Sequence, residues 1–343
     1  MTTATNSPAS AQSAPPENHS KSAGIGLSWR RAVKSPLMPI VAALVLACVV
    51  MFILTPQFLT TSNLMNILTQ SSIVGIAAVG ATFIIITGGI DLSVGSNVAL
   101  SGMVAATLVS AGVDGFIGIL IAILVAAAVG AFNGASVTLL RLAPFIVTLA
   151  VLGMARGLTL QISGGESVYD LPRAFTWLGG GTVAGIPVPV IMTILAFGIG
   201  YFVLSRTTFG HQVYAVGGNR EAARLAGIRD RRVLFSVYLI AGLCAGLAAI
   251  TLVGRLGSAT PTAATGLELQ VIAAVVIGGT SLFGGKGSLA GTFVGVLLIG
   301  VINNGLTLLN VSPFWVQFMQ GLLIFLAVLL DSYNSRRLSK SKR

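Results

Sequence analysis

Charge is the scarcest property of this sequence. Asp, Glu, Lys and Arg together make up 8% of the 343 residues, against roughly 25% in soluble globular proteins. Hydrophobic residues make up 55%, and the mean hydropathy is +0.93. A water-soluble fold would expose far too much of this apolar surface, which excludes a soluble enzyme, a disordered chain and a nucleic-acid-binding module as descriptions of the whole chain. The composition predicts a polytopic membrane protein.

Reactive and metal-binding residues are also few. The only cysteines, Cys48 and Cys244, both lie in apolar runs, and the only histidines, His19 and His211, lie far apart in the sequence. This excludes a disulfide framework and a Cys metal site, and argues against a His-based metal centre. The nine acidic residues lie mostly in polar segments and form no paired-carboxylate or Ser-His-Asp pattern. We therefore predict no metal and no catalytic residues.

Long apolar runs are what the sequence does have. Ten runs can be recognised, at 37–57, 64–88, 92–111, 115–138, 144–162, 187–204, 233–254, 268–283, 289–309 and 313–331. One membrane-spanning helix needs about 20 apolar residues. The sequence therefore predicts an all-α, polytopic transmembrane helical bundle of about ten spans. Whether the segments 64–111 and 268–309 are continuous or contain broken or re-entrant helices stays open.

Positive charge predicts the orientation, because cytoplasmic segments retain Lys and Arg. Fifteen of the 20 basic residues lie in the N-terminal flank, in the loop 205–232 and in the C-terminal tail. An even number of spans puts all three on the same side, so both termini are expected to be cytoplasmic. We predict a disordered N-terminal tail at 1–36, a transmembrane domain at 37–331 and a basic tail at 332–343, with the loop 163–186 on the exterior.

The first motif is Gly88-Gly89-Ile90-Asp91-Leu92-Ser93-Val94-Gly95. An acidic residue between long apolar runs is costly in hydrocarbon and is a candidate functional residue. The glycines allow a sharp turn, and the Ser93 hydroxyl could cap the following helix. In the other interpretation, Asp91 itself caps a helix at the cytoplasmic interface. The sequence leaves both open.

Polar residues inside the apolar runs are candidates for a transport path. Their amides could replace water around a hydroxylated solute, or they could hold helices together by hydrogen bonds, which is the commoner use of a single Asn. Our candidates for the path or its gate are Asp91, Ser93, Asn97, Asn133, Glu268, Asn303 and Asn304.

The second motif lies in the loop 205–232. Asn219 is a suitable N-cap for a short helix over 221–226 that Gly227 would end. Small residues form one face, and Ile228 is expected to be an exposed apolar anchor, so this helix could dock into a groove on a partner. An ordinary positively charged loop would explain the arginines but not this pattern. The docking candidates are Gly217, Asn219, Glu221, Ala222, Ala223, Ala226, Gly227 and Ile228.

The third motif, Gly284-Gly285-Lys286-Gly287-Ser288, is similar to a phosphate loop only superficially. A Walker A motif needs Gly where Thr280 stands and Ser or Thr where Gly287 stands. We interpret the segment as a tight turn between spans.

The sequence also contains a weak internal repeat. Gly88-Gly89 recurs 196 residues later as Gly284-Gly285, and Ile76–Val79 recurs at the same offset as Ile272–Val275. The match fits both an internal duplication and a chance similarity between Ala-, Val- and Gly-rich segments.

Together, the motifs at 89–95, 215–228 and 273–288 resemble those of the ribose-type permeases of bacterial ABC sugar importers. Asn133-Gly134, the segment 144–149 and Asn303-Asn304-Gly305-Leu306 fit the same family. The resemblance covers about 37–331. It implies a multi-pass protein of the bacterial cytoplasmic membrane that moves a monosaccharide by alternating access and is not itself an enzyme.

The resemblance also implies the partners. ATP and Mg²⁺ would be bound by a cytoplasmic ATP-binding subunit, which segment 215–228 would contact, and an extracytoplasmic sugar-binding protein would deliver the solute. A second permease copy would complete the pore, as a homodimer or a heterodimer. Other interpretations are a branched-chain amino-acid ABC permease, an ion-coupled secondary transporter and a membrane-embedded enzyme, the last lacking any catalytic constellation.

Overall fold

The computed structural model describes residues 2–3, 37–312, 314–322, 325–326 and 329. Within them the chain is almost entirely helical, and the prediction of an all-α polytopic membrane bundle is confirmed in its class. The longer helices are α2 (Met38–Leu54), α3 (Thr61–Ile86), α4 (Val94–Ser110), α5 (Gly115–Thr138), α6 (Pro144–Ser163), α8 (Val188–Arg206), α11 (Asp230–Leu256) and α13 (Leu289–Leu308). The shorter elements are η1 (Pro56–Leu59), α7 (Arg173–Gly180), α9 (Thr208–Gly218), α10 (Arg220–Leu225), α12 (Leu267–Ile277) and the strands β1 (Thr182–Val183) and β2 (Ile186–Pro187).

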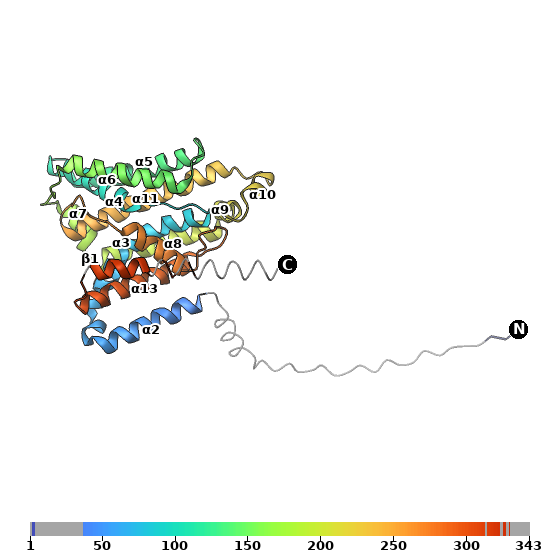
Figure 1. Cartoon of the computed structure of the whole chain (residues 1–343), viewed down its shortest axis with the longest axis horizontal. Coiled ribbons are helices and arrows are strands. Elements are labelled where there is room, and N and C mark those ends of the chain that lie inside the picture. Colours follow the sequence, from blue (N-terminus) through green and yellow to red (C-terminus); the bar gives the residue numbers. More distant parts are fainter. Residues whose placement is uncertain (1, 4–36, 313, 323–324, 327–328, 330–343) are drawn as a thin grey trace.

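Helices α3 and α11 form the centre of the bundle. In the most apolar part of α3, 89% of residues are buried, against 28% in α5 and in α6. Helices α5 and α6 lie on one side of the centre and α2 on the other (Figure 1). Large apolar side chains such as Leu46, Phe116 and Ile146 remain exposed on these outer helices. A surface of this kind is suited to lipid and not to water.

Small residues determine how closely the central helices approach each other. Gly130 of α5 faces Gly242 of α11, and a Cβ at Gly130 would meet the Tyr238 carbonyl and the Gly242 backbone. One turn away on either side, Gly134 lies against the backbone of Phe235 and Gly246 against that of Ile123. Backbones that meet this closely tolerate no larger side chain. The Gly-x-x-x-Gly spacings in α5 and α11 thus bring the two backbones into close contact.

Within the part of the chain that the structure describes, six helices are long and apolar enough to cross a membrane. Helices α2 and α4 have 17 residues each, and α12 has only 11, or roughly 16 Å at 1.5 Å per residue. A bilayer core is about 30 Å thick, so α12 cannot cross it alone. Residues 314–322, 325–326 and 329 are helical, but the other residues of the predicted run 313–331, the tail 332–343 and almost all of the tail 1–36 lie outside the described residues.

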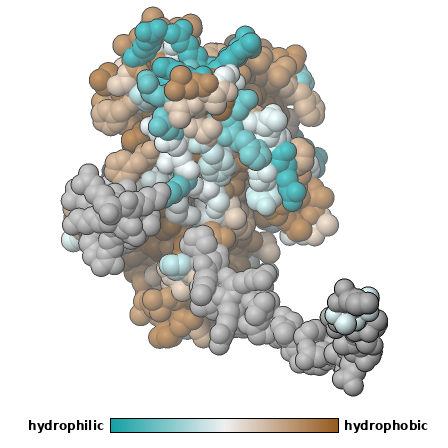
Figure 2. Space-filling view, turned by 90° about the vertical axis from the view of Figure 1, so that its right-hand side faces the viewer, coloured by the Kyte–Doolittle hydropathy of each residue, from teal (hydrophilic) through white to brown (hydrophobic). Residues whose placement is uncertain are grey.

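The two polar loops lie at opposite ends of the bundle. Helix α7 and the hairpin β1–β2 belong to the loop 163–186, and α9 and α10 belong to the loop 205–232 (Figure 1). Seen from the α10 end, hydrophilic residues gather on this end while brown, hydrophobic surface covers the sides (Figure 2). We call these the α7 end and the α10 end. Their separation is what a protein with one polar loop on each side of a membrane requires.

Candidate functional site

The turn between α3 and α4 holds a buried polar network. The Asp91 carboxylate oxygen Oδ1 accepts hydrogen bonds from the Ser93 backbone N–H at 2.8 Å and from the Ser93 hydroxyl at 2.6 Å. The Asn133 amide of α5 in turn donates to the Ser93 hydroxyl at 2.8 Å. The expected capping role is therefore wrong, because the Ser93 side chain makes no capping bond to α4. Its hydroxyl instead joins Asp91 to α5.

Asn97 and Asn133 both face the boundary between α4 and α5. Asn97 donates to the Ala126 carbonyl at 3.1 Å, and both side chains are buried. The Oδ1 atoms of both amides have no hydrogen-bond partner among the described residues. Buried amide oxygens normally have a partner. These two residues therefore tie helices together through their donors and leave two acceptors directed into the protein.

Glu268 begins α12 and lies in a second polar cluster nearer the α7 end. Its Oε1 accepts from the Gly266 N–H at 3.3 Å, whereas its buried Oε2 has no partner in the described structure and lies against Gly95. Arg156 of α6 donates to the carbonyls of Pro261 and Ala263. This arginine therefore holds the segment before α12 against α6, an arrangement that the sequence did not indicate.

Asn303 and Asn304 are neighbours in α13 but have different partners. Asn304 and Asn63 of α3 exchange two hydrogen bonds, at 2.8 and 3.0 Å, and Asn63 also donates to the Phe58 carbonyl. The Asn303 oxygen accepts from the Gln320 amide at 3.1 Å. Asn304 is thus engaged in holding α3 to α13, while Asn303 reaches residues of the segment after α13.

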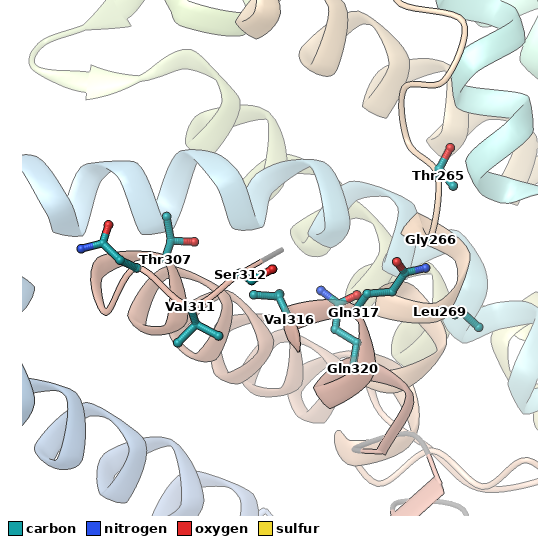
Figure 3. A pocket seen from close by; sticks show the side chains of 10 residues that line it. Thr265, Gly266, Leu269, Thr307, Val311, Ser312, Val316, Gln317 and Gln320 are labelled. Carbon is teal, nitrogen blue, oxygen red and sulfur yellow. The ribbon is translucent and has the colours of Figure 1, made fainter. Parts of the chain in front are cut away.

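That segment borders a polar pocket of about 620 Å³. The side chains come from the segment before α12, from the end of α13 and from the helical residues that follow it (Figure 3). The pocket is lined by Thr265, Gly266, Leu269, Thr307, Asn310, Val311, Ser312, Val316, Gln317 and Gln320. The lining offers hydroxyls and amides but no charged side chain, which suits an uncharged, hydroxylated solute. Two predicted path residues contact this lining: Asn303 through Gln320, and Glu268 through the Gly266 N–H.

The pocket was not predicted from the sequence. Its residues come from the segment before α12, the end of α13 and the residues after it, and although Gln317 and Gln320 lie in the apolar run 313–331, the run alone does not show which segments they meet. The predicted path residues instead fall into separate groups: Asp91, Ser93, Asn97 and Asn133 around α4 and α5, Glu268 near Arg156, and the Asn303–Asn304 pair in α13.

Helix α10 has the local structure that the sequence predicted. The Asn219 side chain accepts from the Ala222 N–H at 3.0 Å, and Gly227 follows the helix with φ of +81°. Asp230 then accepts from Arg220 at 2.6 Å and from Arg224 at 2.8 Å, which anchors α10 to the first turn of α11. The hydrogen bond that the exposed Arg224 guanidinium donates to Asp230 also raises the pKa of Arg224.

The exposed face of α10 differs from the predicted one. Ala223 is buried, and Ile228 is half-buried and packs against the central core, so neither is free to meet a partner. Leu225 is 90% exposed and lies with Ala222 and Ala226 on the outer face. A six-residue helix is too short for its sequence period to decide which side faces the protein, so the expected exposure of Ile228 was wrong.

Helix α9, which was not predicted, joins α10 to the two Gly-Gly turns. A Cβ at Gly217 would meet the Ile86 carbonyl at the end of α3 and the Gly285 N–H. Gly285 itself donates to the Ile86 carbonyl at 2.8 Å, and the Tyr214 hydroxyl donates to the Gly287 carbonyl at 2.8 Å. The turns that follow α3 and α12 therefore meet each other and α9 at the α10 end. The segment 284–288 is a tight turn, as predicted.

Among the described residues, no three His, Cys, Asp or Glu side chains are grouped so that they could hold a metal ion. The sites this structure offers are thus a network around Asp91, a polar pocket near the end of α13, and an exposed helix packed against two turns.

Comparison with known proteins adds three findings. The model of a family described as "Branched-chain amino acid transport system / permease component" matches residues 63–328. The ribose import permease protein of Bacillus subtilis is 48% identical over 305 residues, covering 88% of this chain and 94% of the relative. No solved structure matches the chain.

Two relatives come from Escherichia coli strain K12. Its ribose import permease protein is 44% identical over 309 residues, covering 89% of this chain and 95% of the relative. Its D-allose transport system permease protein is 44% identical over 285 residues, covering 82% and 87% respectively. The similarity thus extends over nearly the whole length of proteins whose names specify monosaccharides.

Proposed function

The chain belongs to the family of branched-chain amino acid transport system permease components, and we propose from this premise that it is the permease subunit of an ABC importer for a monosaccharide. The chain is a multi-pass membrane protein and a transport component, not an enzyme. The observation that carries the sugar assignment is the 44–48% identity with ribose import permeases over nearly nine-tenths of the chain. The amino-acid permease suggested by the family's description is not favoured by these relatives.

Ribose is the specific substrate that the relatives favour. The pocket near the end of α13 supports an uncharged sugar, because its polar lining consists of hydroxyls and amides without a charged side chain. An amino acid carries a carboxylate and an ammonium group, and burying either without a charged partner costs free energy. The pocket thus forms part of the sugar path, with Asn303 behind it.

The partners follow from this role. A cytoplasmic ATP-binding subunit holds ATP and Mg²⁺, an extracytoplasmic binding protein delivers the sugar at the α7 end, and a second copy of the chain completes the pore. We propose about ten membrane crossings with both termini cytoplasmic, which places α9 and α10 on the cytoplasmic side with most of the arginines.

Helix α10 is the segment that contacts the ATP-binding subunit. Its exposed Ala222, Leu225 and Ala226 form a small apolar face, and the bonds from Asp230 fix its orientation. Movement of α10 is transmitted to α9. The close approach of Gly217 and the hydrogen bond of Tyr214 then transmit it to the two Gly-Gly turns. Since these turns end α3 and precede α13, closure of the ATP-binding subunits tilts the central helices and alternates access to the path.

Reconstituted transport tests this function. The chain is co-purified with the ATP-binding subunit and the binding protein encoded beside it and placed in proteoliposomes. Uptake of labelled ribose, allose, arabinose and leucine is then measured. We expect ATP-dependent uptake of a sugar and none of leucine. Uptake of leucine alone would reject the sugar assignment. Uptake that continues without ATP and stops with an uncoupler would instead establish an ion-coupled transporter.

A further inference from the structure

A second cavity, of about 280 Å³, lies at the α10 end where α3, α5 and α11 terminate. Four arginines from three segments line it: Arg141 between α5 and α6, Arg220 and Arg224 on α10, and Arg231 in the first turn of α11. Among the described residues, the one acidic side chain that forms a salt bridge with any of these arginines is Asp230. It binds Arg220 and Arg224 but not the other two. The residues that line the cavity therefore carry four positive charges, and Asp230 beside them offsets one of the four.

Arg141 and Arg231 have no hydrogen-bonded acceptor in the described part of the chain. Arg141 also has a φ of +57°, a conformation that residues other than glycine seldom adopt. Like charges placed this close together repel one another. The lining gathers four guanidinium groups and no carboxylate, so the cavity attracts an anion.

A buried hydroxyl supplies the second, independent observation. Tyr238 of α11 lines the same cavity, is 1% exposed, and its hydroxyl has no hydrogen-bond partner among the described residues. A Cβ at Gly89 would lie 2.9 Å from this oxygen, so the missing side chain at Gly89 keeps the space beside the hydroxyl free. Buried tyrosine hydroxyls usually have a partner. This one is positioned to donate to a ligand in the cavity.

We propose that this cavity binds a phosphate group, which Arg141 and Arg231 hold at the entrance and the Tyr238 hydroxyl contacts at the inner wall. Guanidinium groups bind phosphate oxygens in pairs of parallel hydrogen bonds, and arginine suits such sites better than lysine. The phosphate belongs to an anionic phospholipid headgroup or to a free phosphorylated solute. Either one would link α10 to the ends of α5 and α11 and so stiffen the segment that α9 joins to the turns. This inference does not depend on which solute is transported.

The test compares two probes on the full chain purified in detergent. Inorganic phosphate is titrated while binding is followed by calorimetry, and retention of phosphatidylglycerol against phosphatidylcholine is counted by native mass spectrometry. The variant is Arg141→Gln/Arg231→Gln, which leaves the anchoring pair Arg220 and Arg224 intact. The control is Arg206→Gln/Arg232→Gln, which removes the same charge from exposed arginines that do not line the cavity.

We expect at least one probe to bind the wild type and the control equally, and to bind the Arg141→Gln/Arg231→Gln variant about tenfold more weakly or worse. Tyr238→Phe should weaken binding by several-fold without loss of fold. Selective retention of phosphatidylglycerol identifies the lipid, and binding of inorganic phosphate alone identifies a free solute. Equal loss in variant and control, or no binding by the wild type, overturns the proposal. The proposal is also overturned if the Arg141→Gln/Arg231→Gln variant binds both probes normally but no longer binds the ATP-binding subunit, because the two arginines then bind an acidic surface of that partner.

Discussion

At the scale of single residues, Gly217 and Gly218 offer a matched pair. A Cβ at Gly217 would collide with the Ile86 carbonyl, whereas a Cβ at Gly218 would meet nothing within 4 Å. We expect Gly217→Ala to push α9 away from the turns, to cost about 1–3 kcal/mol of stability and to lower sugar-stimulated ATP hydrolysis of the assembled importer.

Gly218→Ala should leave both properties unchanged. Thermal unfolding in detergent and ATPase assays of the reconstituted complex measure the two effects. If Gly217→Ala hydrolyses ATP and transports sugar as the wild type does, contact between α9 and the turns is not the route by which movement passes to the membrane helices.

Ser93 is the second residue whose role depends on its neighbours. Replacing it with Ala removes the hydroxyl that both Asp91 and Asn133 use, leaving a buried donor and acceptor without that partner. We expect a loss of about 1–2 kcal/mol. Ser101→Ala is the control, because the Ser101 hydroxyl is equally buried and bonds only carbonyls of its own helix. A melting temperature lowered equally by both substitutions would contradict a linking role for Ser93.

At the scale of elements, α3 and α13 are held together by Asn63 and Asn304. Their two reciprocal hydrogen bonds predict a coupling energy of about 0.5–2 kcal/mol in a double-mutant cycle of Asn63→Ala and Asn304→Ala. The cycle of Asn63→Ala with Asn97→Ala shares no partner and should be additive within about 0.5 kcal/mol. Unfolding free energies in detergent give both values. Additivity in the first cycle would show that the two helices are held by packing alone.

Elements also show where local pattern was sufficient and where it was not. Asn219 and Gly227 determine the start and end of α10 by bonds and dihedrals within a few residues, so both were recognisable in the sequence. Which face of α10 is exposed depends on the core beneath it, to which Ala223 and Ile228 belong. Helix α9 has no long apolar run, and it forms where Gly217 and Tyr214 find partners on two distant turns.

At the scale of the whole molecule, the α7 end and the α10 end should lie on opposite sides of the membrane. The background for the test is Cys48→Ala/Cys244→Ala, which removes both native thiols. We expect Glu166→Cys to react in intact cells with a thiol reagent that cannot cross membranes, and Glu221→Cys to react only after permeabilisation. Both positions are exposed, so access to the reagent decides the result. Reaction of both in intact cells would refute the proposed topology.

The sequence by itself determined the class of protein, the positions of most helices and, to within one residue at each end, the short helix predicted at 221–226. Hydrophobic runs and capping residues act over neighbouring positions, and they leave their mark in composition and spacing. It could not determine which polar residues share a site. Ser93 meets a partner 40 residues away, Asn63 one 241 residues away, and the pocket near the end of α13 is assembled from separate helix ends. Only the tertiary structure decided these contacts, because a hydrogen bond or a close backbone approach depends on distances in space, which the spacing of residues along the chain does not specify.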